Sequence, residues 1–251
     1  MRWPAEAIWE AVAPQLPGFT VEIVAELDST NTELMRRARA GRLDPVLLVA
    51  ERQTAGRGRL GRTWASGDGD ALTFSLGLPL APSDWSGLSL AVGVSLAESL
   101  HPDVRLKWPN DLWLDERKLG GILIETASFA DAAAPRHAVI GVGLNIAPRP
   151  AEGLSVRPAW LQERLPGVEP GDALVRVVPA LVTAVQAFEA SGFAPFQLRY
   201  GARDLLRDRA VTLSDGRSGT AHGVTEQGAL LVHTAGGMQP IASAEVSVRP
   251  A

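Results

Sequence analysis

A glycine- and arginine-rich segment between residues 52 and 62 has residue types suited to binding an anionic ligand. It reads Arg-Gln-Thr-Ala-Gly-Arg-Gly-Arg-Leu-Gly-Arg and contains Arg52, Arg57, Arg59 and Arg62. Glycine lets the backbone close around a ligand, and the planar guanidinium of arginine suits phosphate oxygens. The segment alone fits two interpretations equally well: a phosphate-binding loop that becomes ordered around its ligand, or a solvated basic loop that touches nucleic acid.

The same glycines match the G-x-G-x-x-G pattern of dinucleotide-binding folds, from Gly56 to Gly61. That pattern requires a helix that opens at the glycines, so that its N-terminus meets a pyrophosphate. Residues 63–78 instead read as a loop followed by a strand. Two of the variable positions are also arginines, which would crowd a cofactor. We therefore reject a Rossmann fold.

The only two lysines, among 24 lysine and arginine residues, flank a second motif. Lys107 begins Lys-Trp-Pro-Asn-Asp, and Lys118 begins an apolar strand whose two following glycines leave space for a ligand. An ammonium group there can meet a carboxylate or an α-phosphate, and Asn110 and Asp111 carry oxygens of the kind that Mg²⁺ prefers. The motif is also an ordinary β-turn, but its combination with the arginine segment favours a functional site.

The pattern of apolar residues predicts the elements that must position these motifs. Helices are expected at 5–13, 32–40, 84–100 and 173–191, with Thr30 and Glu33 as a capping box for the second. Strands are expected at 20–27, 45–51, 71–80, 119–126 and 137–146, with two short strands around a turn at 104–114. Residues 52–70 are expected to form a long loop. After Asp204, alternating runs separated by glycine turns predict a small module of about five strands.

These elements predict an α/β (α+β) fold with two domains. A mixed β-sheet flanked by helices is expected over residues 1–203, and a small β-barrel-like domain over residues 204–251.

Composition narrows the possible functions. The net charge of −4 argues against a general nucleic-acid binder. The lack of cysteine excludes disulfides, thiolate catalysis and cysteine-based zinc sites, and it is compatible with the reducing cytoplasm. No stretch approaches the length of a membrane span, and the N-terminus does not read as a signal peptide. We therefore expect a cytoplasmic protein without membrane association.

Five ordered motifs resemble those of biotin–protein ligases. They are Ser29-Thr30-Asn31, Gln-Thr-Ala-Gly-Arg-Gly-Arg at 53–59, Lys-Trp-Pro-Asn-Asp at 107–111, Lys-Leu-Gly-Gly-Ile-Leu at 118–123 and Gly-Val-Gly-Leu-Asn at 141–145. Five blocks in the expected order are far more specific than any one of them. The segment after residue 204, with Gln-Gly-Ala-Leu-Leu at 227–231, resembles the SH3-like C-terminal domain of that family. The resemblance implies a class II synthetase-like catalytic domain followed by an SH3-like barrel.

The resemblance also implies two half-reactions. The carboxylate of biotin attacks the α-phosphate of ATP and gives biotinyl-5'-AMP and pyrophosphate. A lysine of the biotin carboxyl carrier domain of acetyl-CoA carboxylase, or of a related carboxylase, then attacks the mixed anhydride. Because a carboxylate is already ionised, the first step needs charge neutralisation and positioning rather than a general base. Biotin and ATP with Mg²⁺ are then substrates, and no tightly bound organic cofactor is expected.

Motif positions assign roles to individual residues by the same resemblance. Biotin is expected to contact Ser29, Thr30, Asn31, Gln53, Gly56, Arg57, Gly58, Arg59, Lys118 and Gly121. The nucleotide is expected to contact Arg57, Arg59, Trp64, Asn110, Lys118 and Asn145. The expected catalytic residues are Lys118, Arg59 and Asp111. Asp111 is expected to help to deprotonate the acceptor lysine and to bind Mg²⁺.

Some of these residues also have ordinary structural explanations. Ser29 or Thr30 could cap the following helix. Trp64 could belong to the core, and Asn145 could end a strand.

Two further expectations concern partners. Some members of the family carry an N-terminal helix-turn-helix domain, which needs about 50 residues or more. Only 28 residues precede Ser29, so we expect no specific DNA binding, whereas exposed sheet edges leave a homodimer possible. The competing functions are a lipoate–protein ligase or octanoyl transferase, which share the catalytic fold, and an RNA-binding module, which the acidic net charge opposes.

Overall fold

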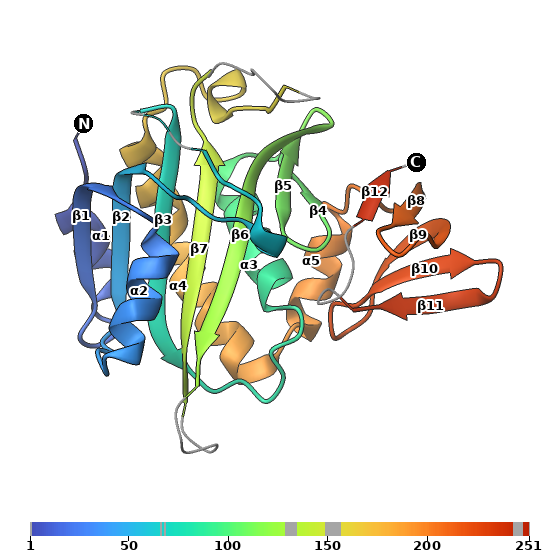
Figure 1. The fold of residues 1–251 in the computed structure, drawn as a ribbon, viewed down its shortest axis with the longest axis horizontal. Coiled ribbons are helices and arrows are strands. Elements are labelled where there is room, and N and C mark those ends of the chain that lie inside the picture. Colours follow the sequence, from blue (N-terminus) through green and yellow to red (C-terminus); the bar gives the residue numbers. More distant parts are fainter. Residues whose placement is uncertain are drawn as a thin grey trace.

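Two β-sheets of different size organise the computed structural model, which describes residues 2–65, 67, 69–128, 135–148, 157–242 and 248–250 (Figure 1). The strands of the larger sheet are β1 (Thr20–Leu27), β2 (Val46–Gln53), β3 (Ala71–Leu80), β4 (Arg105–Lys107), β5 (Asp111–Leu114), β6 (Arg117–Ala127) and β7 (Arg136–Asn145). They lie in the order β1-β2-β3-β7-β6-β5-β4. β1 and β2 run parallel, whereas every other neighbouring pair is antiparallel. The predicted mixed sheet is therefore confirmed.

Helices cover both faces of this sheet (Figure 1). They are α1 (Ala5–Val12), α2 (Thr30–Arg39), α3 (Leu88–Leu100), α4 (Pro170–Ser191) and α5 (Gln197–Gly201). Alternate residues of a strand point to opposite faces, and β2 shows the result. Leu47 and Val49 join the main core with α3 and α4, whereas Val46 and Leu48 pack with Leu34 of α2. The sheet is thus apolar on both sides.

The start of α2 differs from the prediction. The helix begins at Thr30 with Ser29 as its N-cap, and the Ser29 side chain accepts a hydrogen bond from the backbone N–H of Thr32 at 3.4 Å. Glu33 instead forms ion pairs with Arg36 and Arg37. The predicted Thr30–Glu33 capping box is wrong because the helix starts earlier than expected, which frees the Thr30 hydroxyl for the interactions described below.

The long helix α4 corrects a second expectation. Its length and hydropathy are those of a membrane-spanning segment, so one stretch does approach that length. Half of the apolar window, 50%, is buried inside the protein. Leu174, Val178, Leu181 and Val185 are fully buried in the main core. A helix that packs inside a protein is apolar for this reason alone.

The smaller sheet lies beyond β4 (Figure 1). Its strands are β8 (Ala210–Leu213), β9 (Ser218–Val224), β10 (Leu230–Thr234), β11 (Gly237–Ile241) and β12 (Val248–Pro250), in the order β11-β10-β9-β8-β12. The predicted five-stranded C-terminal module is therefore present. The exact boundary between residues 203 and 204 stays a prediction.

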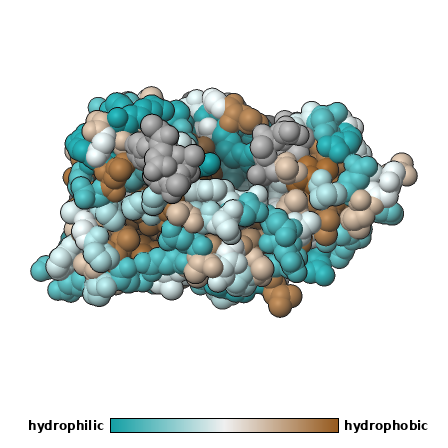
Figure 2. Space-filling view, turned by 90° about the horizontal axis from the view of Figure 1, so that it is seen from below, coloured by the Kyte–Doolittle hydropathy of each residue, from teal (hydrophilic) through white to brown (hydrophobic). Residues whose placement is uncertain are grey.

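Hydrophilic residues predominate on the face shown in Figure 2, where hydrophobic residues form small separate groups. The large hydrophobic side chains that are exposed in the described residues come from separate parts of the chain: Trp9, Leu60, Leu198 and Met238. Leu60 belongs to the arginine-rich segment and lines the site described next.

Candidate active site

The face of the larger sheet that carries α2 also forms the floor of a pocket of about 400 Å³. Strand register explains the floor. Thr73 of β3 lies opposite Gly143 of β7, which lies opposite Gly121 of β6. All three residues line the pocket. Small side chains on this face leave the space that large apolar residues fill on the opposite face.

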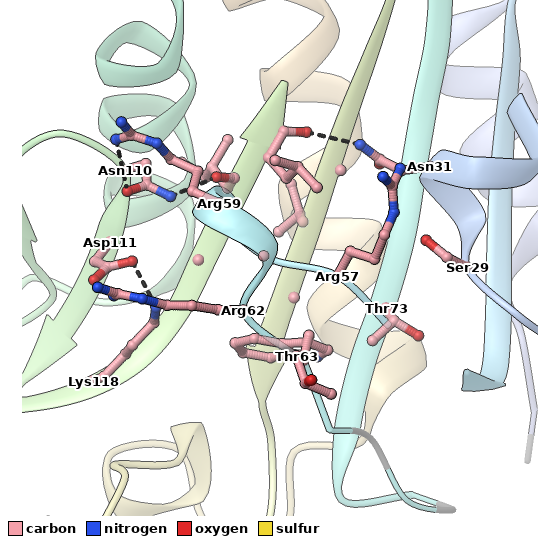
Figure 3. A pocket seen from close by; sticks show the side chains of 18 of the residues that line it. Ser29, Asn31, Arg57, Arg59, Arg62, Thr63, Thr73, Asn110, Asp111 and Lys118 are labelled. Atoms are coloured by element: carbon pink, nitrogen blue, oxygen red, sulfur yellow. Dashed lines mark hydrogen bonds and ion pairs between the residues drawn. The ribbon is translucent and has the colours of Figure 1, made fainter. Parts of the chain in front are cut away.

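Nearly all predicted site residues lie in this pocket. Of the residues assigned to biotin, nucleotide or catalysis, all except Gly56 and Asn145 line it. Ser29 and Asn31 lie on one side, and Asn110, Asp111 and Lys118 lie on the other (Figure 3). Arg57, Arg59 and Arg62 lie between these two groups (Figure 3). Motifs that are far apart in the sequence thus meet around one cavity.

Hydrogen bonds fix the side chains at the Ser29 end. Gln53 Oε1 accepts a hydrogen bond from the backbone N–H of Thr30 at 2.7 Å and lies 3.2 Å from Thr30 Oγ1. The hydroxyl of Ser75 lies 2.7 Å from Thr30 Oγ1 and 2.6 Å from Asn31 Oδ1. Ser29, Thr30 and Asn31 are each 3% exposed. Buried polar groups need such partners, so this end of the pocket is rigid and polar.

Both the nitrogen and the oxygen of the Asn31 side-chain amide are hydrogen-bonded to other protein groups. Its Nδ2 donates to the carbonyl oxygen of Leu123 at 3.1 Å and to Glu125 Oε2 at 2.9 Å, while Oδ1 faces Ser75. A Cβ at Gly141 would lie 2.0 Å from Asn31 Oδ1. Asn31 therefore fits only because residue 141 is glycine, and its hydrogen bonds join α2 to β6 and β3.

The arginine-rich segment forms a strap across the pocket, and residues 56–64 are called the arginine strap below. Its two ends pair, with the backbone N–H of Trp64 donating to Gly56 at 2.9 Å. A Cβ at Gly56 would lie 2.4 Å from the carbonyl oxygen of Trp64. Gly56 thus allows the strap to close rather than lining the pocket. The N–H of Gly58 donates to the carbonyl oxygen of Arg62 at 2.7 Å.

The arginines of the strap have different partners. Arg57 pairs with Glu125 at 2.8 Å, and Arg59 donates to Asn110 Oδ1 at 3.4 Å. Burial lowers the pKa of the Arg59 guanidinium, and the negative charge of Asp111 offsets part of that effect. Arg52 does not belong to the strap: it lies in β2, pairs with Glu26 at 3.2 Å and does not line the pocket. The predicted phosphate-binding loop therefore starts after Arg52.

Lys118 and Asp111 form the charged end of the pocket. The Nζ atom of Lys118 lies 2.7 Å from Asp111 Oδ1. Asn145, predicted to face the nucleotide, is 2% exposed, and its Nδ2 donates to the carbonyl oxygens of Lys118 at 3.3 Å and Ala159 at 3.0 Å. The structure therefore gives Asn145 a role in holding Lys118, and its contact with a nucleotide stays a prediction.

Trp64 covers part of the pocket floor. A Cβ at Gly143 would lie 2.4 Å from Cε2 of the Trp64 ring, so the indole lies directly against the backbone of β7. Trp64 is half-buried and lines the pocket. This placement differs from ordinary core packing and leaves the ring able to stack on a flat ligand.

The described residues contain no group of three or more histidine, aspartate or glutamate side chains that could hold a metal ion. Among the pocket-lining residues that the structure describes, Asp111 alone is acidic, and Lys118 already faces it. Mg²⁺ is commonly bound by one or two carboxylates together with substrate phosphates. The donor set thus fits Mg²⁺ that arrives with ATP better than a resident metal centre.

Several residues of the site did not appear in the predicted list. They are Arg62, Thr73, Ser75, Glu125, Gly141 and Gly143. The sequence does contain a signal for them, because small or polar residues alternate with large apolar residues in β3 and β7. This period of two marks one face of each strand, but the prediction gave only the bounds of the two strands and not the face that each residue occupies.

Two family models match the chain. The Biotin/lipoate A/B protein ligase family matches residues 24–145, and the Biotin protein ligase C terminal domain matches residues 209–249. The Bifunctional ligase/repressor BirA of Escherichia coli (strain K12) is 38% identical over 250 residues, which cover 94% of this chain and 76% of that protein. The chain belongs to the biotin protein ligase family.

Other biotin protein ligases agree with this assignment over almost their whole length. The Biotin--[acetyl-CoA-carboxylase] ligase of Paracoccus denitrificans is 30% identical over 242 residues, covering 89% of this chain and 98% of that protein. The structure of biotin protein ligase from Aquifex aeolicus in complex with biotin and ATP matches with a TM-score of 0.78 and 30% identity, covering 92% and 99% of the two chains. The family and fold class predicted from the sequence are therefore confirmed.

Proposed function

We propose that this chain activates biotin with ATP and ligates it to a lysine of a carboxylase biotin carrier domain, through biotinyl-5'-AMP. One observation carries the proposal. A single pocket joins the rigid polar residues around Ser29 and Gln53 to the ion pair of Lys118 and Asp111, with the arginine strap between them. Such a pocket suits a long ligand that is neutral and polar at one end and anionic at the other.

The polar end matches the ureido ring of biotin, which has two N–H donors and one carbonyl acceptor. Ser29, Thr30 and Gln53 supply hydroxyl and amide groups that can pair with such a ring. The Ser29 oxygen also caps α2, so the same group orders the helix and faces the pocket. Asn31 supports this end through its contacts with Ser75 and Glu125.

In the first half-reaction, a carboxylate oxygen of biotin forms a bond to the α-phosphorus of ATP. The bond between that phosphorus and the bridging oxygen breaks, and pyrophosphate leaves with the electron pair. Negative charges must approach one another in this step, so cationic side chains lower its barrier. Arg57, Arg59 and Arg62 of the strap and Lys118 at the charged end line the pocket, and Mg²⁺ is proposed to enter with ATP.

In the second half-reaction, the amine of the acceptor lysine attacks the carbonyl carbon of the anhydride, and AMP leaves. The amine must first lose a proton, because a lysine with a pKa near 10.4 is mostly protonated at neutral pH. Asp111 is the proposed proton acceptor, since it is the described carboxylate that lines the pocket.

The acid that triggers pyrophosphate release distinguishes biotin ligation from lipoate ligation. The protein is incubated with MgATP and either biotin or lipoate, and pyrophosphate is measured before a carrier domain is added. We expect release with biotin only, followed by a mass increase of one biotinyl group on the carrier domain. Release with lipoate and none with biotin would refute the proposal.

A further inference from the structure

The indole of Trp108 joins the Lys-Trp-Pro-Asn-Asp motif of the active site, residues 107–111, to the C-terminal sheet. Trp108 is 1% exposed, and it lies between Lys107 and the pocket residues Asn110 and Asp111 in the sequence. Its Nε1 donates a hydrogen bond to the carbonyl oxygen of Gly228, 3.1 Å away, in the turn between β9 and β10. A residue 120 positions away in the sequence therefore helps to fix the motif.

Close packing holds that turn in place. Gly228 has a φ of +79°, which favours glycine, and a Cβ there would lie 2.8 Å from the Cα of Gly87. Gly87 is the N-cap of α3 and also has a positive φ, +81°. The left-handed backbone of Gly87 is not helical, so α3 begins at Leu88 rather than at the predicted residue 84. The contact between Gly228 and Gly87 also fixes the carbonyl that Trp108 binds.

The backbone of Trp108 has a second support in a buried pair, Tyr200 and Asp204. The Tyr200 hydroxyl lies 3.5 Å from Asp204 Oδ1, and the backbone of Trp108 lies close enough to oppose part of the rise in the pKa of Tyr200 that burial causes. Tyr200 is 0% exposed and Asp204 is 9% exposed. Asp204 Oδ1 accepts a further hydrogen bond from the N–H of Leu206 at 2.9 Å. Asp204 is thus held through Oδ1, whereas its Oδ2 is buried without a hydrogen-bond partner.

The segment that carries Asp204 is joined to β4 like an additional strand. Leu106 and Asp204 form a parallel bridge, in which the N–H of Leu106 donates to Arg203 at 2.8 Å and the N–H of Leu205 donates to Leu106 at 2.9 Å. β4 ends at Lys107, directly before Trp108. Movement of this segment would therefore be passed to the motif.

We infer that Tyr200 and Asp204 are positioning residues for the adenylation step: they hold Trp108 and thereby set the positions of Asn110 and Asp111 in the pocket. The inference rests on the proposed function. Neither Tyr200 nor Asp204 lines the main pocket, so they act through Trp108 rather than by touching substrates. Tyr200 lines a small cavity together with Asn110 and Asp111 of the motif.

Steady-state kinetics of Tyr200→Phe and Asp204→Ala test this inference. Both changes remove a group from the buried contacts between residues 200–204 and Trp108. Small displacements of groups that position a substrate can lower a rate by about tenfold to a hundredfold. We expect adenylation to slow by that amount and the KM for ATP to rise. The KM for biotin should stay unchanged, because Ser29, Thr30 and Gln53 are held by α2 and β2.

Two further variants separate positioning from general destabilisation. Asp204→Asn keeps an oxygen that can accept from Leu206 and Tyr200, so it should retain wild-type kinetics. Gly228→Ala displaces the other support of Trp108 and should reproduce the kinetic pattern of Tyr200→Phe, although it lies in the C-terminal sheet. Leu174→Ala in α4 serves as the control, since it lowers stability without touching Trp108.

The outcomes are distinct. Wild-type kinetics in Tyr200→Phe or Asp204→Ala would overturn the inference. The inference would also fail if the KM values for ATP and for biotin changed equally and Leu174→Ala gave the same changes. That pattern would indicate a merely structural role. If the wild-type protein forms no biotinyl-adenylate at all, the proposed function fails, which is a different result from either of these.

Discussion

The ammonium group of Lys118 lies 2.7 Å from the carboxylate of Asp111, across neighbouring strands β6 and β5. The two residues lie close together because Asp111 pairs in register with Gly121, whose missing side chain leaves room for the lysine. A Cβ at Gly121 would lie 3.3 Å from Lys118 Nζ. The pair therefore holds one positive and one negative charge at the end of the pocket where substrate anions are expected.

Lys118→Ala should abolish most adenylation activity. The change removes a cation and leaves Asp111 as an unpaired negative charge facing the phosphates. Removal of one preorganised electrostatic contact costs about a hundredfold to a thousandfold in rate, and we expect a loss in that range in pyrophosphate release. Lys107→Ala is the comparison, because Lys107 lies over the Trp113 ring at 4.9 Å and should matter less. An unchanged thermal midpoint would show that the fold is intact, and equal losses in both variants would contradict the role of Lys118.

Gly143→Ala should weaken ATP binding. The added Cβ would lie 2.4 Å from the Trp64 ring, so the indole must move off the pocket floor. Stacking of a base on an aromatic ring contributes about 1–3 kcal/mol, and we expect the KM for ATP to rise by roughly tenfold. Gly201→Ala is a matched control, since its Cβ would meet only Arg207 at 3.5 Å. An unchanged KM for ATP in Gly143→Ala would mean that Trp64 does not contact the nucleotide.

Arg59→Ala should release biotinyl-adenylate faster. A hydrogen bond to a charged group contributes about 1.5–3 kcal/mol, which corresponds to a roughly tenfold to hundredfold faster release. The measurement is the rate at which the preformed intermediate leaves the protein after rapid gel filtration. Arg59→Lys retains the charge but loses the planar fork, so its release rate should lie between those of wild type and Arg59→Ala. Identical release rates for all three proteins would argue against a contact between Arg59 and the intermediate.

Asp204→Asn should change how stability depends on pH. Burial raises the pKa of Asp204 from 3.8 to about 6, although the N–H of Leu206 opposes the shift. The folded state therefore holds this proton more tightly than the unfolded state, and folding stability falls as pH rises from about 4 to 6. Above that range the charged carboxylate costs the folded state up to about 3 kcal/mol. Asparagine removes this cost, because it does not ionise.

Urea unfolding at about pH 4 and about pH 8 measures the effect. The free energy of unfolding of Asp204→Asn minus that of wild type should be larger at the higher pH, so that the variant gains stability relative to wild type. Comparison of the two proteins at each pH cancels the titration of the other acidic groups. A difference that is the same at both pH values would show that Asp204 does not titrate in this range.

The sequence predicted the fold class and most of the pocket because both depend on local patterns and on ordered motifs. β3 has the predicted bounds, and Lys118, Arg59 and Asp111 lie together as their motifs implied. Contacts between distant segments could not be predicted in the same way. Asn31 reaches Glu125 across 94 positions, and this contact depends on strand register and on Gly141, which no local pattern specifies.

Register also explains two contacts that residue type did not predict. Arg52 was grouped with the arginine strap, but β2 extends to Gln53 and directs Arg52 to Glu26. Asn145 lies at the end of β7, which turns its amide towards Lys118 and Ala159, while its assignment to the nucleotide stays a prediction. In both cases the backbone path decides which way a polar side chain points, and residue type alone does not contain that information.

The carboxylate of Glu125, which pairs with Arg57, competes with any anionic ligand for that arginine of the strap. Any ligand that binds Arg57 must displace the carboxylate of Glu125, which also accepts a hydrogen bond from Asn31. Ligand binding at Arg57 therefore replaces one anionic partner with another. A small inorganic anion makes too few contacts with the pocket to displace Glu125 from Arg57. A ligand that also contacts both ends of the pocket gains enough interactions to compensate for breaking the ion pair. The ligand-free strap thereby selects ligands by their length.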